Sequence, residues 1–336
     1  MTTRRTTRAG LQIPNFTYPD VANEDLFERV AEIATTGERA GFDTVFVMDH
    51  FFQLPLLGPP HHEMFEAYTL LGALAARTAT ARLGTLVTGV TYREPAILAK
   101  QVTALDVISR GRALLGIGAA WFDVEHEALG VEFPPVAERF EHLEDALRIC
   151  RAMFTEEGAT VSGTHHSVAG AFNVPPPVQD GGPPILIGGA GERKTFRMAA
   201  QYADELNVIA GFDELPGKLA ALQRHLDDLG RDRSDIAVST LAFLVPGQTH
   251  AEAETALHDF ARRLGIDDPA AFYDSEAGKG VLARVIWGDP DEVAKQASDV
   301  LAAGLDGLVV NLPANGHDLG IVSLAGDIIT SVVGAA

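Results

Sequence analysis

The stretch from Arg82 to Trp121, RLGTLVTGVTYREPAILAKQVTALDVISRGRALLGIGAAW, decides the fold that this chain predicts. Residues 83–87 and 112–117 are short apolar runs of the kind that form buried strands. Between them, Glu94-Pro95 predicts the start of a helix, because proline suits the first helical position. A strand, a helix and a second strand in this order form one parallel βαβ unit.

Small residues follow both of these strands. Thr88-Gly89-Val90 comes after the first strand, and Gly118-Ala119-Ala120-Trp121 comes after the second. The carboxyl ends of parallel strands are where α/β folds place their ligands. Residues without long side chains let the backbone approach a flat or anionic ligand closely.

The same alternation of strand and helix continues along the chain and predicts a single (β/α)8 barrel, with loop insertions at its C-terminal face. We expect a flexible tail over residues 1–10 and one barrel domain over 11–336. The eight predicted strands are 11–16, 43–48, 83–87, 112–117, 184–187, 205–209, 237–245 and 307–311.

Four segments interrupt the alternation and should shape a substrate pocket: 53–67, 122–137, 155–183 and 265–285. Residues 155–183 are long for a connection, so they predict a functional insertion or a small hairpin. Residues 265–285 predict a second, irregular insertion. Apolar residues such as Phe51, Leu56 and Phe133 in or beside these loops suit a partly hydrophobic substrate or ordinary loop packing.

Composition and charge argue against several classes of protein. The chain has 336 residues, of which 46% are hydrophobic, and a net charge of −20, which argues against a nucleic-acid-binding surface. No apolar run reaches the roughly 18 residues of a membrane span. The single cysteine, Cys150, fits a reducing compartment, and no apolar segment follows the basic start of the chain. We therefore expect a cytoplasmic protein with a small-molecule substrate.

Asp49-His50 is an adjacent acid and imidazole at the predicted end of the second strand. His50 can give or take a proton near neutral pH, and Asp49 could bond a ligand donor or bias the imidazole. Both are therefore candidate catalytic residues. The alternative is a histidine with a structural partner beside an aspartate in a turn.

The run Gly188-Gly189-Ala190-Gly191 leads into a predicted helix. Exposed backbone amides and the helix dipole favour an anion there, such as a phosphate. A turn that only needs positive φ would have the same letters. Trp121 could likewise cover a cofactor ring or pack against its own loop.

Two pairs of adjacent histidines, His61-His62 and His165-His166, lie in predicted loops. No cysteine accompanies them, and no HExxH spacing is present, so the sequence predicts no metal site.

Several motifs together resemble the luciferase-like monooxygenase superfamily, in the branch that uses the deazaflavin coenzyme F420. They are MDHF after the second strand, the stretch quoted above, Glu138-Arg139 with a downstream LEDAL, PPILIGGAGERKT with a following YAD, and VIWGDPDEV. They span nearly the whole chain in this order.

The resemblance implies a barrel whose cofactor ring rests on a non-prolyl cis peptide, expected here at Gly89–Val90, with His50 as the catalytic or ring-adjacent histidine. It also implies hydride transfer between the deazaflavin C5 and an organic substrate, and a homodimer. Ala120 and His166 depart from residues that relatives often carry, a glycine and an aromatic residue. The implied cofactor-binding residues are Asp49, Thr88, Gly89, Val90, Gly118, Ala119, Ala120, Trp121, Gly188, Gly189, Ala190 and Gly191.

Three alternatives stay open at this point. An FMN-dependent monooxygenase of the same superfamily would need the same cradle. A non-catalytic flavin-binding barrel would keep the glycine turn but tolerate replacement of His50. A cofactor-free barrel lyase or aldolase would need a desolvated lysine at a strand end, whereas the lysines fall on predicted helices or loops.

Overall fold

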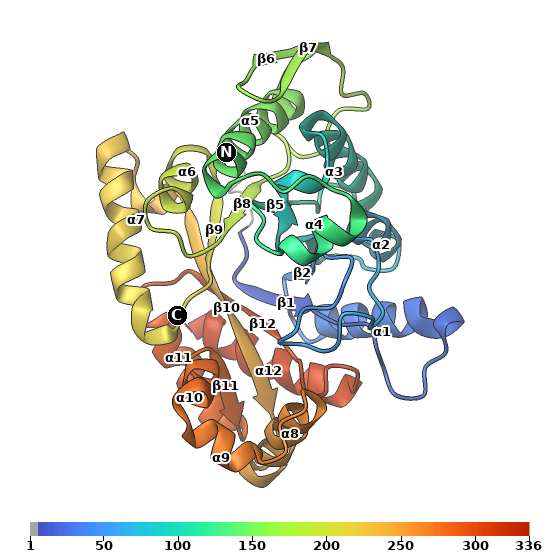
Figure 1. Ribbon diagram of the computed structural model, residues 1–336, viewed down its shortest axis with the longest axis vertical. Helices are drawn as coiled ribbons and strands as arrows, with labels where there is room; N and C mark the ends of the chain where they lie inside the picture. The colour runs from blue at the N-terminus through green and yellow to red at the C-terminus, as the bar shows by residue number, and fades with distance from the viewer. Residues whose placement is uncertain (1–5, 336) are drawn as a thin grey trace.

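In the computed structural model, which describes residues 6–335, a barrel of parallel strands is surrounded by helices (Figure 1). Neighbouring strands pair in the order β3-β2-β1-β12-β10-β9-β8-β5-β4. Since β3 and β4 are two pieces of one interrupted strand, eight strand positions close the ring, and the predicted (β/α)8 barrel is confirmed. The barrel strands are β1 (Ala9–Ile13), β2 (Thr44–Val47), β3 (Arg82–Thr85), β4 (Thr88–Gly89), β5 (Leu115–Gly118), β8 (Ile185–Gly188), β9 (Glu205–Val208), β10 (Ala237–Pro246) and β12 (Gly307–Asn311).

The helices cover the outside of this ring, and the largest apolar core lies between them and the strands. Their bounds are α1 (Leu26–Arg39), α2 (Ala67–Ala75), α3 (Pro95–Ser109), α4 (Asp123–Leu129), α5 (Val136–Thr155), α6 (Thr195–Tyr202), α7 (Leu215–Leu229), α8 (His250–Arg263), α9 (Pro269–Asp274), α10 (Glu276–Leu282), α11 (Pro290–Leu301) and α12 (Leu319–Ala335). Short 3-10 helices occur at Asn23–Asp25, Val90–Tyr92, Phe212–Glu214 and Arg233–Asp235. None of the helices within residues 6–335 combines the length and apolar character needed to cross a bilayer.

A second, smaller cluster fills the inside of the barrel. Its buried members come from different strands and from the segment after β3, so the lumen is a packed core rather than a channel. They are Phe46, Leu86, Leu114, Leu186 and Val309. The ligand-binding space must therefore lie above this layer, at the carboxyl ends of the strands.

The third strand is interrupted close to the segment where the non-prolyl cis peptide was expected. β3 pairs with β2 as far as Thr85, two residues short of the predicted strand end, and pairing with β5 begins only at Thr88. The non-prolyl cis peptide lies in this gap, between Leu86 and Val87. The prediction of Gly89–Val90 is therefore wrong by three residues, because the strand ends earlier than its apolar run.

Two insertions have regular structure. The predicted hairpin within 155–183 is confirmed, as β6 (Ala159–Ser162) and β7 (Ser167–Ala171) pair antiparallel. The prediction that 265–285 is irregular is wrong. The segment forms α9 and α10, whose first turns are capped by the side chains of Asp268 and Ser275, and it leads into a further strand, β11 (Val285–Gly288).

β11 pairs with the last four residues of β10, beyond the part of that strand that closes the barrel. We call the apolar group around it the satellite core, which is separate from the main core. Its buried members are Val245, Leu257, Phe260, Val285 and Ala314.

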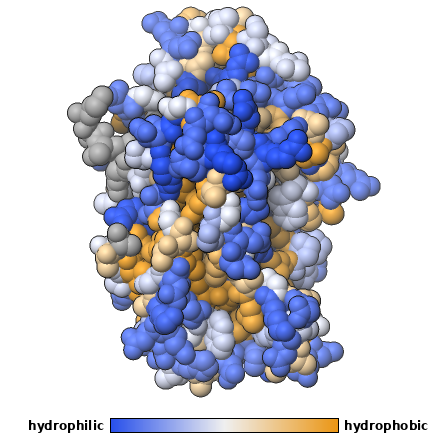
Figure 2. All heavy atoms as spheres, turned by 90° about the vertical axis from the view of Figure 1, so that its left-hand side faces the viewer, coloured by the Kyte–Doolittle hydropathy of each residue, from blue (hydrophilic) through white to orange (hydrophobic). Residues whose placement is uncertain are grey.

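The amino terminus also differs from expectation. β1 begins at Ala9 and Thr7 is buried, so the predicted tail of residues 1–10 is too long at its inner end. The reason is the parallel pairing of Ala9 and Gly10 with β12. Residues 1–5 lie outside the described part of the chain. Seen from the side of α7, polar residues dominate the upper part of the molecule and apolar residues gather in a band across its middle (Figure 2).

Candidate active site

His50 lies just after β2, where the parallel strands end, and its ring is paired with a buried carboxylate. Its Nδ1 is 2.9 Å from Oε2 of Glu125, a residue of α4. The side chain of Glu125 is fully buried, whereas that of His50 is 12% exposed. With Nδ1 engaged, Nε2 is the nitrogen that remains for a ligand.

Glu125 is held by more than the histidine. Its Oε1 accepts the backbone N–H groups of Phe51 and Phe52 at 2.6 and 2.7 Å, and Tyr92 donates its hydroxyl to Oε2. Burial raises the pKa of the Glu125 carboxyl, but the hydrogen bonds from His50, Tyr92 and the backbone outweigh it and lower the pKa. The group is therefore a carboxylate at neutral pH and fixes the orientation of the imidazole.

Asp49 has a different partner. Arg93 donates to both of its oxygens, at 2.6 and 3.0 Å, and also to Glu66 at 2.6 Å. The Asp49 side chain is 1% exposed, and burial raises its pKa although the Arg93 guanidinium opposes that shift. The structure therefore gives Asp49 a buried ion pair with Arg93.

Two aromatic side chains lie beside His50. The rings of Trp121 and Phe122 lie edge-on to His50, with centroids 6.0 and 5.8 Å away. Trp121 is 62% exposed and so is free to contact a ligand, whereas Phe122 is buried. Ala120 has φ of 58°, a left-handed conformation that is uncommon for a residue other than glycine.

The floor of the site is made of backbone and one small side chain. Val87, from the break in the third strand, fills the space beside Gly118 and Gly188: a Cβ at Gly188 would lie 2.7 Å from its Cγ1. Gln12 fixes the same segment by donating to the Leu86 carbonyl at 3.0 Å. Thr88 is buried and bonds Tyr68, while Gly89 and Val90 follow beside it.

The glycine turn Gly188–Gly191 lies next to this floor and is half-buried to exposed. Gly189 has φ of 145°, a conformation that requires glycine, and its N–H donates to the Asn207 carbonyl at 3.0 Å. The turn leads to α6 as predicted, with Lys194 at its cap position.

One cation lies at the turn. Lys218 of α7 donates to the Ala190 carbonyl at 3.4 Å, and it also pairs with Glu192 at 3.0 Å and Glu214 at 3.6 Å. Arg139 of α5 lies at the neighbouring segment, where it donates to the Ala119 carbonyl at 3.0 Å. An anionic ligand at the turn would therefore meet the amino end of the segment before α6 and one lysine that is already paired with carboxylates.

The fold thus brings His50, Thr88–Val90, Gly118–Trp121 and Gly188–Gly191 to one end of the barrel. Sequence reasoning missed Glu125 because α4 was taken for a loop, and it also missed Tyr92 and Arg93, which lie between β4 and α3. The helix-forming run Asp123–Leu129, closed by Gly130 at φ of 69°, was the signal that could have shown it.

Comparisons with known proteins agree with this architecture. A sequence profile for the family "Luciferase-like monooxygenase" matches residues 8–307. An F420-dependent glucose-6-phosphate dehydrogenase of Microbacterium testaceum is 30% identical over 313 residues, covering 85% of this chain and 87% of the relative. A protein of the same name from Kineococcus radiotolerans is 27% identical, covering 90% and 92%.

Solved structures share the fold. The coenzyme F420 dependent tetrahydromethanopterin reductase of Methanopyrus kandleri superimposes with a TM-score of 0.77 at 18% identity, covering 97% of this chain and 99% of its own. An F420-dependent secondary alcohol dehydrogenase, solved with an F420-acetone adduct, gives 0.78 at 21% identity, covering 98% and 99%.

Proposed function

This chain belongs to the luciferase-like monooxygenase family, and from that premise we propose that it is an oxidoreductase that uses coenzyme F420. Support comes from relatives named as F420-dependent dehydrogenases that match along most of their length. The site fits such a coenzyme because its floor carries no side chain larger than Val87 and Lys218 lies beside its glycine turn.

The residues that would hold the coenzyme divide into two groups. Thr88, Gly89 and Val90 would lie under the ring with Gly118, Ala119, Ala120 and Trp121 beside it. The backbone of Gly188, Gly189, Ala190 and Gly191 would bind the phosphate of its tail, helped by Lys218. The Gly189 N–H, which already donates to Asn207, would not be one of the donors. Asp49 would act as a positioning residue, holding Arg93 under the floor.

The reaction we propose is hydride transfer between the coenzyme ring and a small organic substrate, which the coenzyme makes possible as a two-electron carrier. His50 would hold the accompanying proton on Nε2, accepting it from a substrate hydroxyl or returning it to a carbonyl. Glu125 would keep the imidazole in that orientation and stabilise its protonated form. The buried Glu125–His50 pair at the barrel mouth carries this proposal.

Apolar side chains in the loops after β2, among them Phe51 and Leu56, suit a partly hydrophobic substrate. Leu56 also lines a cavity of about 10 Å³ against the satellite core, which is too small for a substrate and reflects local packing. The remaining lining residues are Phe243, Val245, Leu257, Phe260, Tyr273, Val281, Val285 and Pro313.

Titration of the purified protein with F420 and, separately, with FMN tests the cofactor, with quenching of cofactor fluorescence as the readout. We expect saturable binding of F420 at least tenfold tighter than that of FMN. Tighter FMN binding would favour a flavin monooxygenase instead. Oxidation of glucose-6-phosphate, followed by the loss of F420 absorbance, is the first activity to assay because two relatives carry that name.

We further propose a homodimer. One face of α3 carries exposed apolar side chains one to three turns apart, and Ile97 and Ile108 are 59% and 53% exposed. Large exposed aliphatic side chains in a row on one helix favour association with another apolar surface.

A further inference from the structure

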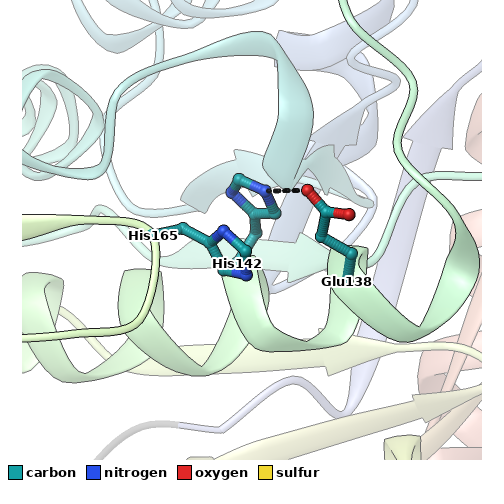
Figure 3. A group of neighbouring side chains, drawn as sticks. All are labelled: Glu138, His142 and His165. Carbon is teal, nitrogen blue, oxygen red and sulfur yellow. Dashed lines mark ion pairs between the residues drawn. The ribbon is translucent and has the colours of Figure 1, made fainter.

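A cluster of histidines and carboxylates lies outside the proposed active site, where the β6–β7 hairpin turns back against α5. Glu138 and His142 occupy successive turns of α5, and His165 comes from the turn of the hairpin (Figure 3). One ligand-type atom of each lies within 4.8 Å of the others. We propose that these three residues bind a Zn²⁺ ion, which ties the hairpin to the barrel.

The donor types and spacing suit zinc. Imidazole nitrogen and carboxylate oxygen bind Zn²⁺ at about 2.0–2.2 Å, so donors in a tetrahedral site lie about 3.4 Å apart. His142 Nε2 is already 3.8 Å from Glu138 Oε1. The rings of His142 and His165 stack with centroids 4.1 Å apart, so one ring must turn out of the stack before the in-plane lone pairs of both can reach one ion. Rotation of His165 about its side-chain bonds would close the site, with water as the fourth ligand.

The hydrogen bonds around the cluster leave the required nitrogens available. His142 Nδ1 is 2.8 Å from His166 Nε2, and His166 Nδ1 is 3.0 Å from Glu94 Oε2. If each Nδ1–H donates along this chain, Nε2 of His142 keeps its lone pair for a metal. One set of tautomers thus satisfies all of these contacts.

His165 is oriented in the same way. Its Nε2 lies 2.8 Å from Glu141 Oε2, so donation to that carboxylate leaves Nδ1 for the ion. Zinc-binding histidines generally donate their second ring N–H to a carboxylate or another acceptor, which fixes the ring. Both histidines of this cluster have such an acceptor in place.

The backbone of the turn is also fixed. Asp145 of α5 accepts the N–H groups of Thr164, His165 and His166 at 3.1, 2.7 and 3.0 Å. A Cβ at Gly163 would lie 2.3 Å from this carboxylate, so glycine is needed for the turn to come this close. The position of His165 relative to α5 is therefore set before any metal binds, which lowers the entropic cost of binding.

The experiment is calorimetric titration of the full-length protein, treated first with a chelator, with zinc chloride. We expect one zinc per chain. Glu138→Ala should weaken binding at least about tenfold, and because alanine favours a helix and Glu138 is 41% exposed, this variant should fold. His142→Ala should abolish the tight site, and loss of the outer histidine in His166→Ala should weaken it about 10- to 100-fold.

The matched control is the double variant His61→Ala/His62→Ala, which removes the other adjacent histidine pair and should leave zinc binding unchanged. Co²⁺ added in place of zinc should give the intense visible absorption of a tetrahedral site in the control but not in Glu138→Ala. Wild-type binding no stronger than that of Glu138→Ala, or equal loss in the control, would overturn the proposal. Neither result depends on F420 binding or on turnover.

Discussion

His50 gives the sharpest functional test on the level of single residues. His50→Ala removes the proposed proton carrier but no backbone contact to the coenzyme, so kcat should fall about 10²- to 10⁴-fold while the F420 dissociation constant stays within about twofold. Steady-state kinetics and fluorescence titration measure the two quantities. His258→Ala, on α8, serves as the control, and weakened binding with intact turnover would contradict the assigned role.

Arg82 forms a buried ion pair with Glu205 at the end of the barrel opposite to His50, and its replacement gives a test of stability. It donates to Glu205 at 2.6 Å, and each side chain is 3% exposed. Arg82→Met would leave the Glu205 carboxylate buried without its cation, so we expect a loss of about 3–5 kcal/mol in unfolding free energy. Urea denaturation measures it.

The control for this variant is Arg77→Ala, which removes a two-bond pair with Glu28 whose side chains are 42% and 57% exposed. Solvent screens such a pair, so its loss should be much smaller. Equal losses in the two variants would mean that burial does not strengthen the Arg82 contact.

Sequence reasoning placed His50 at the carboxyl end of β2 but missed its partner. The apolar run before Asp49 fixes where β2 ends, and so places His50 at the mouth. Glu125 lies 75 positions away, and only the folded chain brings the two together. The partner of Asp49 was missed for the same reason, since Arg93 is 44 positions away.

Among whole elements, the contact of β5 with the end of β3 gives a test of packing. A Cβ at Gly116 would lie 1.8 Å from the Thr85 carbonyl oxygen, so Gly116→Ala must push the strands apart. We expect a loss of about 1–3 kcal/mol in stability and weaker F420 binding, since the break that holds Val87 would move.

Gly72→Ala in α2 is the matched control. No atom lies within 4 Å of the added methyl group, and alanine is the better helix former, so stability should rise by up to about 1 kcal/mol. Thermal unfolding of both variants measures the difference. A harmless Gly116→Ala would contradict the close approach of the two strands.

The hydrogen bonds between α1 and the residues just before β3 should contribute a stability that depends on pH. Glu38 accepts the backbone N–H groups of residues 79, 80 and 81. Partial burial raises its pKa, but these hydrogen bonds outweigh it and lower the pKa below 4.5. A carboxyl with a lowered pKa stabilises the fold above its unfolded value, and this contribution is lost as pH falls through the folded value.

Glu38→Gln should therefore reduce stability at neutral pH, and its deficit relative to wild type should shrink as the pH is lowered below 4.5. Urea denaturation at a series of pH values measures this. Glu32→Gln, on the same helix, should show little change at any pH. A deficit independent of pH would contradict the role of the charge.

Helices and strands were predicted correctly where apolar residues recur at a regular spacing. They were missed where side-chain caps and tertiary contacts determine the structure. The long helix α5 and the eight barrel strands follow from their patterns. α9, α10 and β11 are short, and their pairing with β10 and their side-chain caps form only in the folded context. The break after Thr85 was missed because its apolar run continues to Val87.

On the scale of the whole molecule, the α3 face predicts how copies associate. If Ile97 and Ile108 lie in a dimer interface, the double variant Ile97→Glu/Ile108→Glu should run as a monomer, since a buried unpaired charge is costly. Light scattering after size-exclusion chromatography measures the mass. The double variant Val174→Glu/Val178→Glu, with similar exposure, is the control. A monomeric wild type would contradict the proposed homodimer.

The satellite core around β11 separates two demands on the molecule. Its apolar cluster is distinct from the main core and joins the barrel through the outer end of β10. Mutations in the satellite core can therefore change the packing around β11 while the main core, which holds the strands that lead to His50 and the glycine turn, stays intact. Variation in this part of the molecule should be tolerated more readily than variation between the helices and the barrel strands.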